Sequence, residues 1–248
     1  MTEGSSFQPS SLHAPSRPSV TDAERPTLCL VTDRRRLSRR ARTTRDELAA
    51  LEAALDEAGA AGIDVIQVRE RDLEAADLAA FVARVARRMR GTATRVVVNE
   101  RADVARAAGA DGVHLRSDGP PVDRIRAWAP RAWRVGRSVH SAADAERHQS
   151  ADYLLFGTTF ASTSKPAGAP VAGLAALGEA VRVSAAPIWA IGGVTPETAP
   201  ACIDVGAKGV AAIAAFLDAR DGTRRGAVRA RVEAMRRAVA RDFRKLIE

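Results

Sequence analysis

The feature that most constrains the fold of this 248-residue sequence is a repeated alternation of short apolar runs and longer amphipathic segments. Segments of helical period separate most of the apolar runs, as in residues 46–58, 73–88 and 172–183. The eight apolar runs, each followed by a polar or Gly-rich turn, are residues 28–31, 65–68, 96–98, 112–115, 133–135, 153–156, 188–191 and 210–213. Strands that alternate with helices pair in parallel through right-handed crossovers. The sequence therefore predicts an α/β fold, a single (β/α)8 TIM barrel.

An open doubly wound sheet is the structural alternative to the barrel. No GxGxxG motif follows the first strand, and eight units favour closure. Gly59 is expected to end the first long helix, and the fourth unit has only a short helical stretch at residues 123–128. Residues 1–26, rich in Ser, Pro, Thr and Glu, predict a disordered tail. We therefore expect a barrel domain at residues 27–222 and a closing helix at residues 223–248, where apolar and basic residues alternate at helical spacing.

Composition narrows the classes of function. Aromatic residues make up only 4% of the chain, so we expect Ala, Val, Leu and Ile to fill the core. Lys and Arg number 38 against 30 Asp and Glu, a net charge of +8, which raises the question of a nucleic-acid partner. The arginines are scattered over many helical segments without interleaved aromatics. We therefore favour solvated helix faces with a few phosphate-binding arginines, and no nucleic-acid partner.

Cysteines, histidines and apolar segments indicate the cellular compartment and the absence of common metal motifs. Cys29 and Cys202 show no metal-binding spacing and are expected as buried thiols in a reducing compartment. The four histidines form no HExxH pair. No segment resembles a signal peptide or is apolar over a membrane-spanning length. We expect a cytoplasmic protein without membrane association, and the sequence leaves homo-oligomerisation open.

Polar residues at the end of the second strand are informative, because TIM-barrel sites lie at the carboxyl ends of the strands. Gln67, Arg69 and Arg71 alternate, which places their side chains on one side of the strand, facing the barrel mouth. Polar groups there are costly unless a ligand or counter-charge compensates them. A structural ion pair with Glu70 or Glu100 is the alternative explanation.

The third and fourth strands end near carboxylates. Asn99 and Glu100 follow the third strand, and Asp118 follows the fourth. Carboxylate and amide oxygens suit a hard cation such as Mg²⁺. Two other interpretations stay open: Asn99 as a helix cap, and Asp118 as a turn residue before Gly119.

The fifth and sixth strands end in hydroxyl-rich segments. After the fifth strand, Ser141 is expected to cap the following helix, which leaves Ser138 facing inward. His140 is an acid/base candidate or a structurally bonded histidine. Beyond the sixth strand, the hydroxyls of Ser162 and Ser164 and the ammonium of Lys165 make a suitable cradle for an oxyanion.

The last two strands end in small residues that suit a phosphate. Gly192 and Gly193 let the backbone approach an anion closely. The amides near Ile213 and Ala214 are expected to start the next helix, and loops after strands seven and eight form a phosphate site in many barrels. We expect few purely structural reasons for a glycine pair at this position.

These motifs together resemble the thiamine-phosphate synthase and thiazole tautomerase superfamily over about residues 28–217. The matching stretches are TD at 32–33, QVRER at 67–71, VNERAD at 98–103, GADGVHL at 109–115, GRSVHS at 136–141, ADYLLFG at 151–157, AIGGVTP at 190–196 and GAKGVA at 206–211. The resemblance implies that a hydroxymethylpyrimidine diphosphate is joined to a thiazole phosphate, with release of diphosphate and help from Mg²⁺.

The resemblance also implies roles for individual residues. The pyrimidine diphosphate would lie against Gln67, Arg69, Arg71 and Asn99. Ser138 and Lys165 would act in catalysis. The phosphate and diphosphate groups would contact Ser138, Ser162, Ser164, Lys165, Gly193, Ile213 and Ala214, and the metal would lie at Glu100 and Asp118.

The sequence departs from the synthase pattern at several of these positions. That pattern usually has Lys in place of Arg71, Asp in place of Glu100 and Ser in place of Ala214, and Asp118 stands one place early. The tautomerase branch, which isomerises a thiazole carboxylate phosphate, is the alternative. Its acid/base histidine would stand at Thr158, whose hydroxyl is a poor proton carrier, so the synthase is favoured. A barrel that binds thiamine precursors without turnover is a third hypothesis.

Overall fold

The computed structural model describes residues 25–37, 42–162, 168, 170–218 and 224–240. Its strands form one closed parallel barrel in chain order, because β1 pairs with both β2 and β8. The strands are β1 (Thr27–Val31), β2 (Val65–Val68), β3 (Arg95–Asn99), β4 (Gly112–Leu115), β5 (Arg134–Val139), β6 (Tyr153–Phe156), β7 (Ile188–Ile191) and β8 (Gly209–Ala212). The predicted TIM barrel is confirmed, and the open sheet is excluded.

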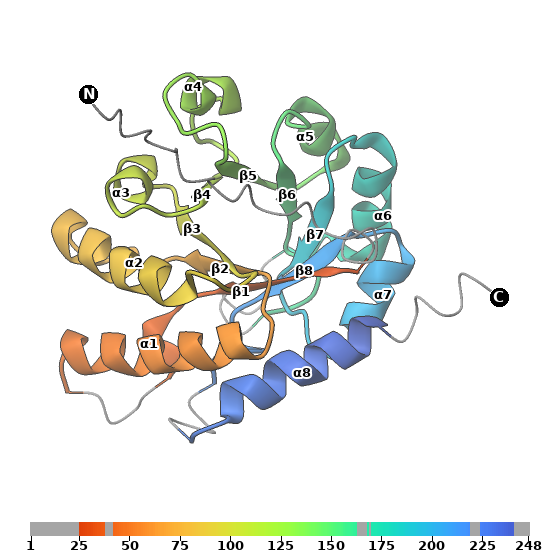
Figure 1. Ribbon diagram of the computed structural model, residues 1–248. Coiled ribbons are helices and arrows are strands. Elements are labelled where there is room, and N and C mark those ends of the chain that lie inside the picture. Colours follow the sequence, from red (N-terminus) through yellow and green to blue (C-terminus); the bar gives the residue numbers. More distant parts are fainter. Residues whose placement is uncertain (1–24, 38–41, 163–167, 169, 219–223, 241–248) are drawn as a thin grey trace, which may run out of the picture.

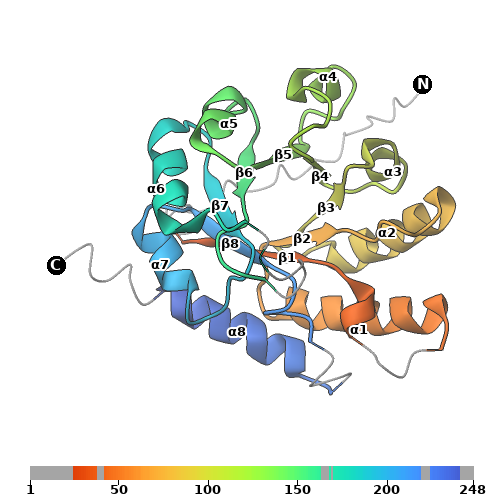
Figure 2. The same ribbon diagram turned by 180° about the vertical axis from the view of Figure 1, so that it is seen from behind.

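Helices form a ring around the barrel (Figures 1 and 2). They are η1 (Arg34–Arg36), α1 (Thr44–Ala60), α2 (Ala75–Met89), α3 (Ala102–Ala107), α4 (Val122–Arg126), α5 (Ala142–Arg147), α6 (Gly173–Val183), α7 (Ala199–Asp204) and α8 (Ala227–Ala240). α8 packs against α1 and α7 and completes the ring. Residues 1–24 and 241–248 lie outside the described residues, so the predicted tail and domain limits stay predictions. Among the described helices, none combines the length and apolar character needed to cross a bilayer.

The two longest helices near the N-terminus show why these segments are helical. Thr43 caps α1, and its side chain accepts a hydrogen bond from the Asp46 amide at 3.1 Å. α2 has an apolar stripe, with buried side chains at Leu78, Phe81, Val82, Val85 and Met89. This spacing of three and four residues turns one helix face toward the barrel.

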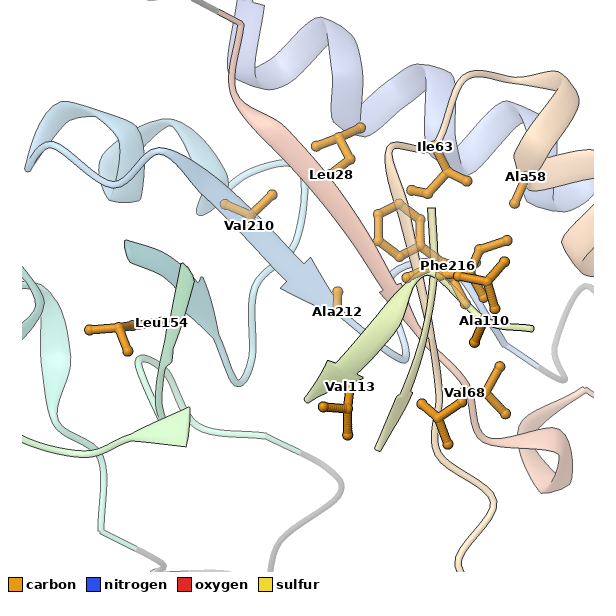
Figure 3. Close-up of a cluster of buried hydrophobic side chains, with 14 of the residues drawn as sticks. Leu28, Ala58, Ile63, Val68, Ala110, Val113, Leu154, Val210, Ala212 and Phe216 are labelled. Atoms are coloured by element: carbon orange, nitrogen blue, oxygen red, sulfur yellow. The ribbon is translucent and has the colours of Figure 1, made fainter. Parts of the chain in front are cut away.

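The core has two layers, because successive strand residues point to opposite faces. The outer layer fills the space between strands and helices and includes Leu28, Val113, Leu154 and Val210 (Figure 3). The inner layer lies inside the barrel. Its buried members are Cys29, Val31, Val65, Val97, Tyr153, Leu155, Trp189 and Ala211.

Aromatic rings also lie inside the barrel. The rings of Tyr153 and Trp189 are stacked with centroids 4.0 Å apart, and His114 stacks on Tyr153 at 5.6 Å. The expectation that aliphatic residues alone fill the core was therefore wrong for the inner layer.

The first strand is anchored at the N-terminal end of the barrel. The carboxylate of Asp64 accepts a hydrogen bond from the Leu28 amide at 2.8 Å and pairs with Arg236 of α8 at 2.6 Å. Arg236 also donates to the carbonyl oxygens of Pro26 at 2.7 Å and Gly62 at 3.0 Å. α8 is thereby joined to the point where the chain enters β1.

Candidate active site

A cavity of about 780 Å³ opens at the carboxyl ends of the strands, where the sequence placed the site. Its volume lies within the range of small-molecule sites, about 300–1,000 Å³. The predicted site residues that line it are Gln67, Arg69, Arg71, Asn99, Ser138, Ser162, Gly193, Ile213 and Ala214. The fold therefore brings together groups from strands that are far apart in the sequence.

A chain of side-chain hydrogen bonds crosses the ends of β2 and β3. Gln67 donates from Nε2 to Asn99 Oδ1 at 2.9 Å, and Asn99 donates from Nδ2 to Glu100 Oε2 at 2.9 Å. Gln67 is only 2% exposed, and its Oε1 has no hydrogen-bond partner among the described residues. A buried acceptor without a donor costs free energy, so this oxygen is available to a ligand donor in the cavity.

Glu100 has an unusual backbone conformation. Its φ is 65°, which is uncommon for a residue with a side chain. The Arg101 amide donates to the Asn99 carbonyl at 2.7 Å, so the chain makes a tight turn around Glu100. Strain of this kind is found where the surrounding structure fixes a side chain in a required direction. Here it fixes the carboxylate beside Asn99.

The side chains beyond β2 alternate as predicted. Arg69 and Arg71 line the cavity, whereas Glu70 is buried on the other side and pairs with Arg34 at 3.0 Å. Glu100 pairs with Arg116 instead. The proposed structural ion pair of Arg69 or Arg71 with Glu70 or Glu100 is therefore not found, and neither guanidinium has an ion pair within the described part of the chain. Burial and the neighbouring Arg71 lower the pKa of Arg69, so an anion at this point would be favourable.

Arg116 lies between the two predicted metal ligands. Its Nε pairs with Glu100 Oε1 at 3.1 Å, and its Nη2 pairs with Asp118 Oδ2 at 2.8 Å. Asp118 is 67% exposed and does not line the large cavity. Among the described residues, no group of three or more His, Cys, Asp or Glu side chains comes together as a metal site. The predicted Mg²⁺ ligands do not fit a metal site in this arrangement, because a guanidinium already holds both carboxylates.

Ser138 faces the cavity from β5 and is joined to His114. Ser138 Oγ and His114 Nε2 are 2.9 Å apart. Burial, with a smaller contribution from Arg137, lowers the pKa of His114 to about 3. The imidazole is therefore neutral near pH 7 and orients the serine hydroxyl without adding charge.

Arg137, which neighbours Ser138, points away from the cavity. It donates to the carbonyl oxygens of Ser117, Gly119 and Pro120 at 2.8–2.9 Å and so holds the loop after β4. Ser141 caps α5 as predicted, with its Oγ accepting from the Asp144 amide at 3.1 Å. These contacts fix the backbone on both sides of Ser138.

His140 lies at the cavity edge with its ring already bonded. Its Nδ1 shares a hydrogen bond with the carbonyl oxygen of Gly157, at the end of β6. Of the two interpretations of this histidine, the geometry favours the structural one, since the bond fixes the loop after β5 against β6.

The glycine pair after β7 has a structural requirement that was not expected from the sequence. Gly192 has a φ of 97° and Gly193 a φ of 66°, both in the left-handed region. A Cβ at Gly193 would lie 2.3 Å from the Ala161 carbonyl oxygen. The expectation that structure alone would not demand these glycines was therefore wrong. They allow the loop after β6 to pack against the end of β7 and, at the same time, line the cavity.

Backbone amides after β7 and β8 form a second polar region of the cavity. Within the described residues, the amide N–H groups of Gly193, Ala214 and Ala215 have no protein acceptor. These residues line the cavity, and free amides at this position of a barrel suit a phosphate.

Arg231 of α8 reaches the same region, and sequence reasoning missed it. Its Nη1 donates to the Ala214 carbonyl oxygen at 3.3 Å, and its Nη2 lies 3.7 Å from Asp218 Oδ2. It is one of several basic residues on α8, and the sequence pattern gives no signal that distinguishes it. Two other predicted residues, Ser164 and Lys165, lie outside the described residues, so their roles stay predictions.

Comparison with known proteins identifies relatives. The model of the family described as thiamine monophosphate synthase matches residues 28–216. The thiamine-phosphate synthase of Methanoculleus marisnigri is 40% identical over 168 residues, which cover 67% of this chain and 80% of that protein. That of Thiobacillus denitrificans is 36% identical over 194 residues, covering 77% of this chain and 90% of that protein. The structure of a thiamine phosphate pyrophosphorylase from Pyrococcus furiosus superposes with a TM-score of 0.71 at 28% identity, covering 88% of this chain and 97% of that one.

Proposed function

This chain belongs to the thiamine monophosphate synthase family, and we propose that it acts as a thiamine-phosphate synthase. In the proposed reaction, the C–O bond between the pyrimidine methylene and the diphosphate breaks, and its electron pair leaves with the diphosphate oxygen. The thiazole nitrogen then donates its lone pair to that methylene, and a C–N bond forms. The products are thiamine phosphate and diphosphate, and no net proton transfer is required.

The observation that carries this proposal is a cavity with two separate regions for anions. Arg69 and Arg71 line it beyond β2, and the free amides of Gly193 and Ala214 line it beyond β7 and β8. One substrate of the proposed reaction carries a diphosphate and the other a phosphate. Two phosphorylated substrates placed in these regions would meet over the barrel axis.

The pyrimidine is assigned to the region between β2 and β3. The unpartnered Oε1 of Gln67 would accept a hydrogen bond from the amino group of the ring. Asn99 holds the Gln67 amide from the other side. Gln67, held by Asn99, would therefore fix the orientation of the pyrimidine ring.

Departure of the diphosphate requires stabilisation of negative charge on the leaving oxygens. Arg69 and Arg71 supply two guanidinium groups that form no ion pair within the described residues. The Ser138 hydroxyl would donate a hydrogen bond to a diphosphate oxygen. His114, which contacts Ser138 Oγ, stays neutral and adds no charge. Lys165 is proposed to contribute a further positive charge. No step here uses a metal, because the carboxylates predicted as its ligands are held by Arg116.

The thiazole phosphate is assigned to the region after β7 and β8. The amides of Gly193 and Ala214 would donate to its phosphate oxygens, beside Ile213. Arg231 adds a guanidinium next to these amides. Ser162, which lines the cavity, and Ser164 are proposed to complete the phosphate contacts.

The test is a direct assay for product. The purified chain is incubated with hydroxymethylpyrimidine diphosphate, thiazole phosphate and Mg²⁺, and thiamine phosphate is measured by oxidation to fluorescent thiochrome phosphate. In parallel, aromatisation of the thiazole carboxylate phosphate is followed without pyrimidine. We expect product in the first assay only. Turnover in the second assay alone would establish the tautomerase, and binding of both substrates without turnover in either assay would establish a non-catalytic protein.

A further inference from the structure

We infer that the guanidinium of Arg116 takes the place of a divalent cation at the diphosphate end of the site, so that this protein binds diphosphate without a metal. The inference rests on the proposed function for the identity of the anion. Its geometric basis is independent of turnover, because it concerns which cation lies between Glu100 and Asp118.

Arg116 contacts both carboxylates in one arrangement. Its Nε and Nη2 atoms, neighbours on one guanidinium, contact Glu100 Oε1 at 3.1 Å and Asp118 Oδ2 at 2.8 Å. Both distances are those of charge-assisted hydrogen bonds or close ion pairs. Asn99 donates to the second oxygen of Glu100 at 2.9 Å. Glu100 therefore has partners on both of its oxygens.

A hard cation would have to displace this arginine. Mg²⁺ requires near-octahedral oxygen coordination at about 2.0–2.1 Å, and a guanidinium beside the same two carboxylates repels it. The described residues also supply no cluster of three acidic, His or Cys side chains at this position. The permanent charge of arginine makes the exchange unfavourable at any ordinary pH.

Arg116 still has donors for an anion. It is 56% exposed and lines the large cavity together with Arg69 and Arg71. The same three arginines line an adjoining cavity of about 350 Å³. A guanidinium has five N–H donors, so the contacts of Nε and Nη2 with the carboxylates leave Nη1 for a ligand. Three arginines thus line a space that is large enough for a diphosphate.

The substitution changes how the leaving group is stabilised. When the methylene C–O bond breaks, the negative charge on the departing oxygen is met by fixed guanidinium N–H groups that the chain itself supplies. Glu100 and Asp118 then hold Arg116 in position and do not bind the ligand. This also accounts for Glu100, whose strained backbone directs its carboxylate toward Arg116 and Asn99.

The first test is a calorimetric titration of the chain with inorganic diphosphate in the presence of EDTA. We expect the wild-type chain to bind diphosphate in EDTA, with an affinity that saturating Mg²⁺ changes by less than about threefold. Arg116→Ser should weaken binding in EDTA by about tenfold. The matched control is Arg95→Ser, because Arg95 is 62% exposed, lies at the start of β3 and, among the described residues, pairs only with Asp111. This control should bind diphosphate like the wild type.

A second measurement uses Mn²⁺ as a paramagnetic probe of the two carboxylates. Electron paramagnetic resonance should detect no Mn²⁺ bound to the wild-type chain in the absence of diphosphate. Arg116→Ser frees Glu100 and Asp118, so it should gain Mn²⁺ binding, and adding Glu100→Gln should abolish that gain. Tight Mn²⁺ binding by the wild type, or diphosphate binding only in the presence of Mg²⁺, would overturn the inference.

Turnover separates this inference from the proposed function. Thiamine phosphate formation by the wild type should persist in EDTA, at a rate within about threefold of that with Mg²⁺. Product formed only with Mg²⁺ would overturn the role of Arg116 and support the synthase. A chain that forms no product in either condition would overturn the synthase, and the diphosphate titration would then decide the role of Arg116 by itself.

Discussion

Gly136 on β5 leaves the space that the ring of Tyr153 on β6 occupies. A Cβ at position 136 would lie 2.0 Å from Tyr153 Cζ, and the ring cannot move away because it is stacked on Trp189. Gly136→Ala should therefore destabilise the fold by about 3 kcal/mol or more, since overpacking of a rigid core is costly. Urea unfolding followed by circular dichroism measures this change.

The matched control for that experiment is Gly178→Ala. Gly178 lies within α6, and a Cβ there would meet Val205 at an ordinary 3.5 Å. This change should leave stability unchanged or raise it by up to about 1 kcal/mol, because alanine is the better helix former. Equal stability of the two variants would show that the barrel interior can accommodate a methyl group beside the Tyr153 ring.

Gln67→Leu removes the acceptor assigned to the pyrimidine amino group. We expect kcat/KM for the pyrimidine diphosphate to fall by about 10- to 100-fold, the loss of one buried hydrogen bond, with KM for thiazole phosphate nearly unchanged. Steady-state kinetics with each substrate varied in turn provides the measurement. Gln149→Leu is the control, because Gln149 is exposed and accepts a hydrogen bond from the Ala185 amide, away from the cavity. An equal loss for both substrates would contradict the assignment.

His114 should make stability depend on pH. Its pKa is about 3 in the folded chain, below the ordinary value of 6.5, so the unfolded chain binds the proton more readily between these values. Stability contributed by the neutral imidazole is therefore full above about pH 6.5 and falls as the pH is lowered. From about pH 7 to about pH 5, the loss should be about 2 kcal/mol. In His114→Gln, the unfolding free energy should change less over this range, and parallel curves would refute the prediction.

Arg231→Gln tests whether Arg231 of α8 contributes to the phosphate site formed by the amides after β7 and β8. KM for thiazole phosphate should rise about tenfold with little change in kcat, because a charge-assisted contact to a bound phosphate is lost. Arg237→Gln is the control on the same helix, since Arg237 is 64% exposed and pairs with Glu233. A similar KM for both variants would remove Arg231 from the phosphate site.

Lys165→Ala should weaken the binding of thiazole phosphate and of inorganic diphosphate, each by about tenfold, through loss of one ammonium. Calorimetry measures both affinities. Lys208→Ala provides the control, because Lys208 is exposed at the opposite end of the barrel, just before β8. Unchanged affinities in Lys165→Ala would contradict its assignment.

Much of the fold could be predicted because burial in a parallel barrel produces continuous apolar runs. β2, β4, β6 and β7 coincide with those runs. The end of β5 was not predicted, because the strand continues beyond the apolar run of residues 133–135 through the polar residues Arg137 and Ser138. Gly59 was expected to end α1, but the helix continues to Ala60. Position 59 requires a small residue because Met89 packs against it. A Cβ there would lie 2.7 Å from Met89 Sδ.

The site was predictable where alternation along one strand decides direction, as for Gln67, Arg69 and Arg71. It was not predictable where partners are separated in sequence and neither is distinctive. Arg116 is one of many arginines, and only the fold places it between Glu100 and Asp118. The choice of Arg231 among the basic residues of α8 likewise depends on helix packing.

The contacts of Arg236 and Asp64 with the start of β1 have a practical consequence. Because all strands are parallel, the chain enters the barrel at the end remote from the cavity. A surface tether or affinity handle attached ahead of Pro26 would therefore orient the cavity toward the bulk solution. Immobilised in this way, the protein should capture its substrates from a flowing stream as readily as when it is free.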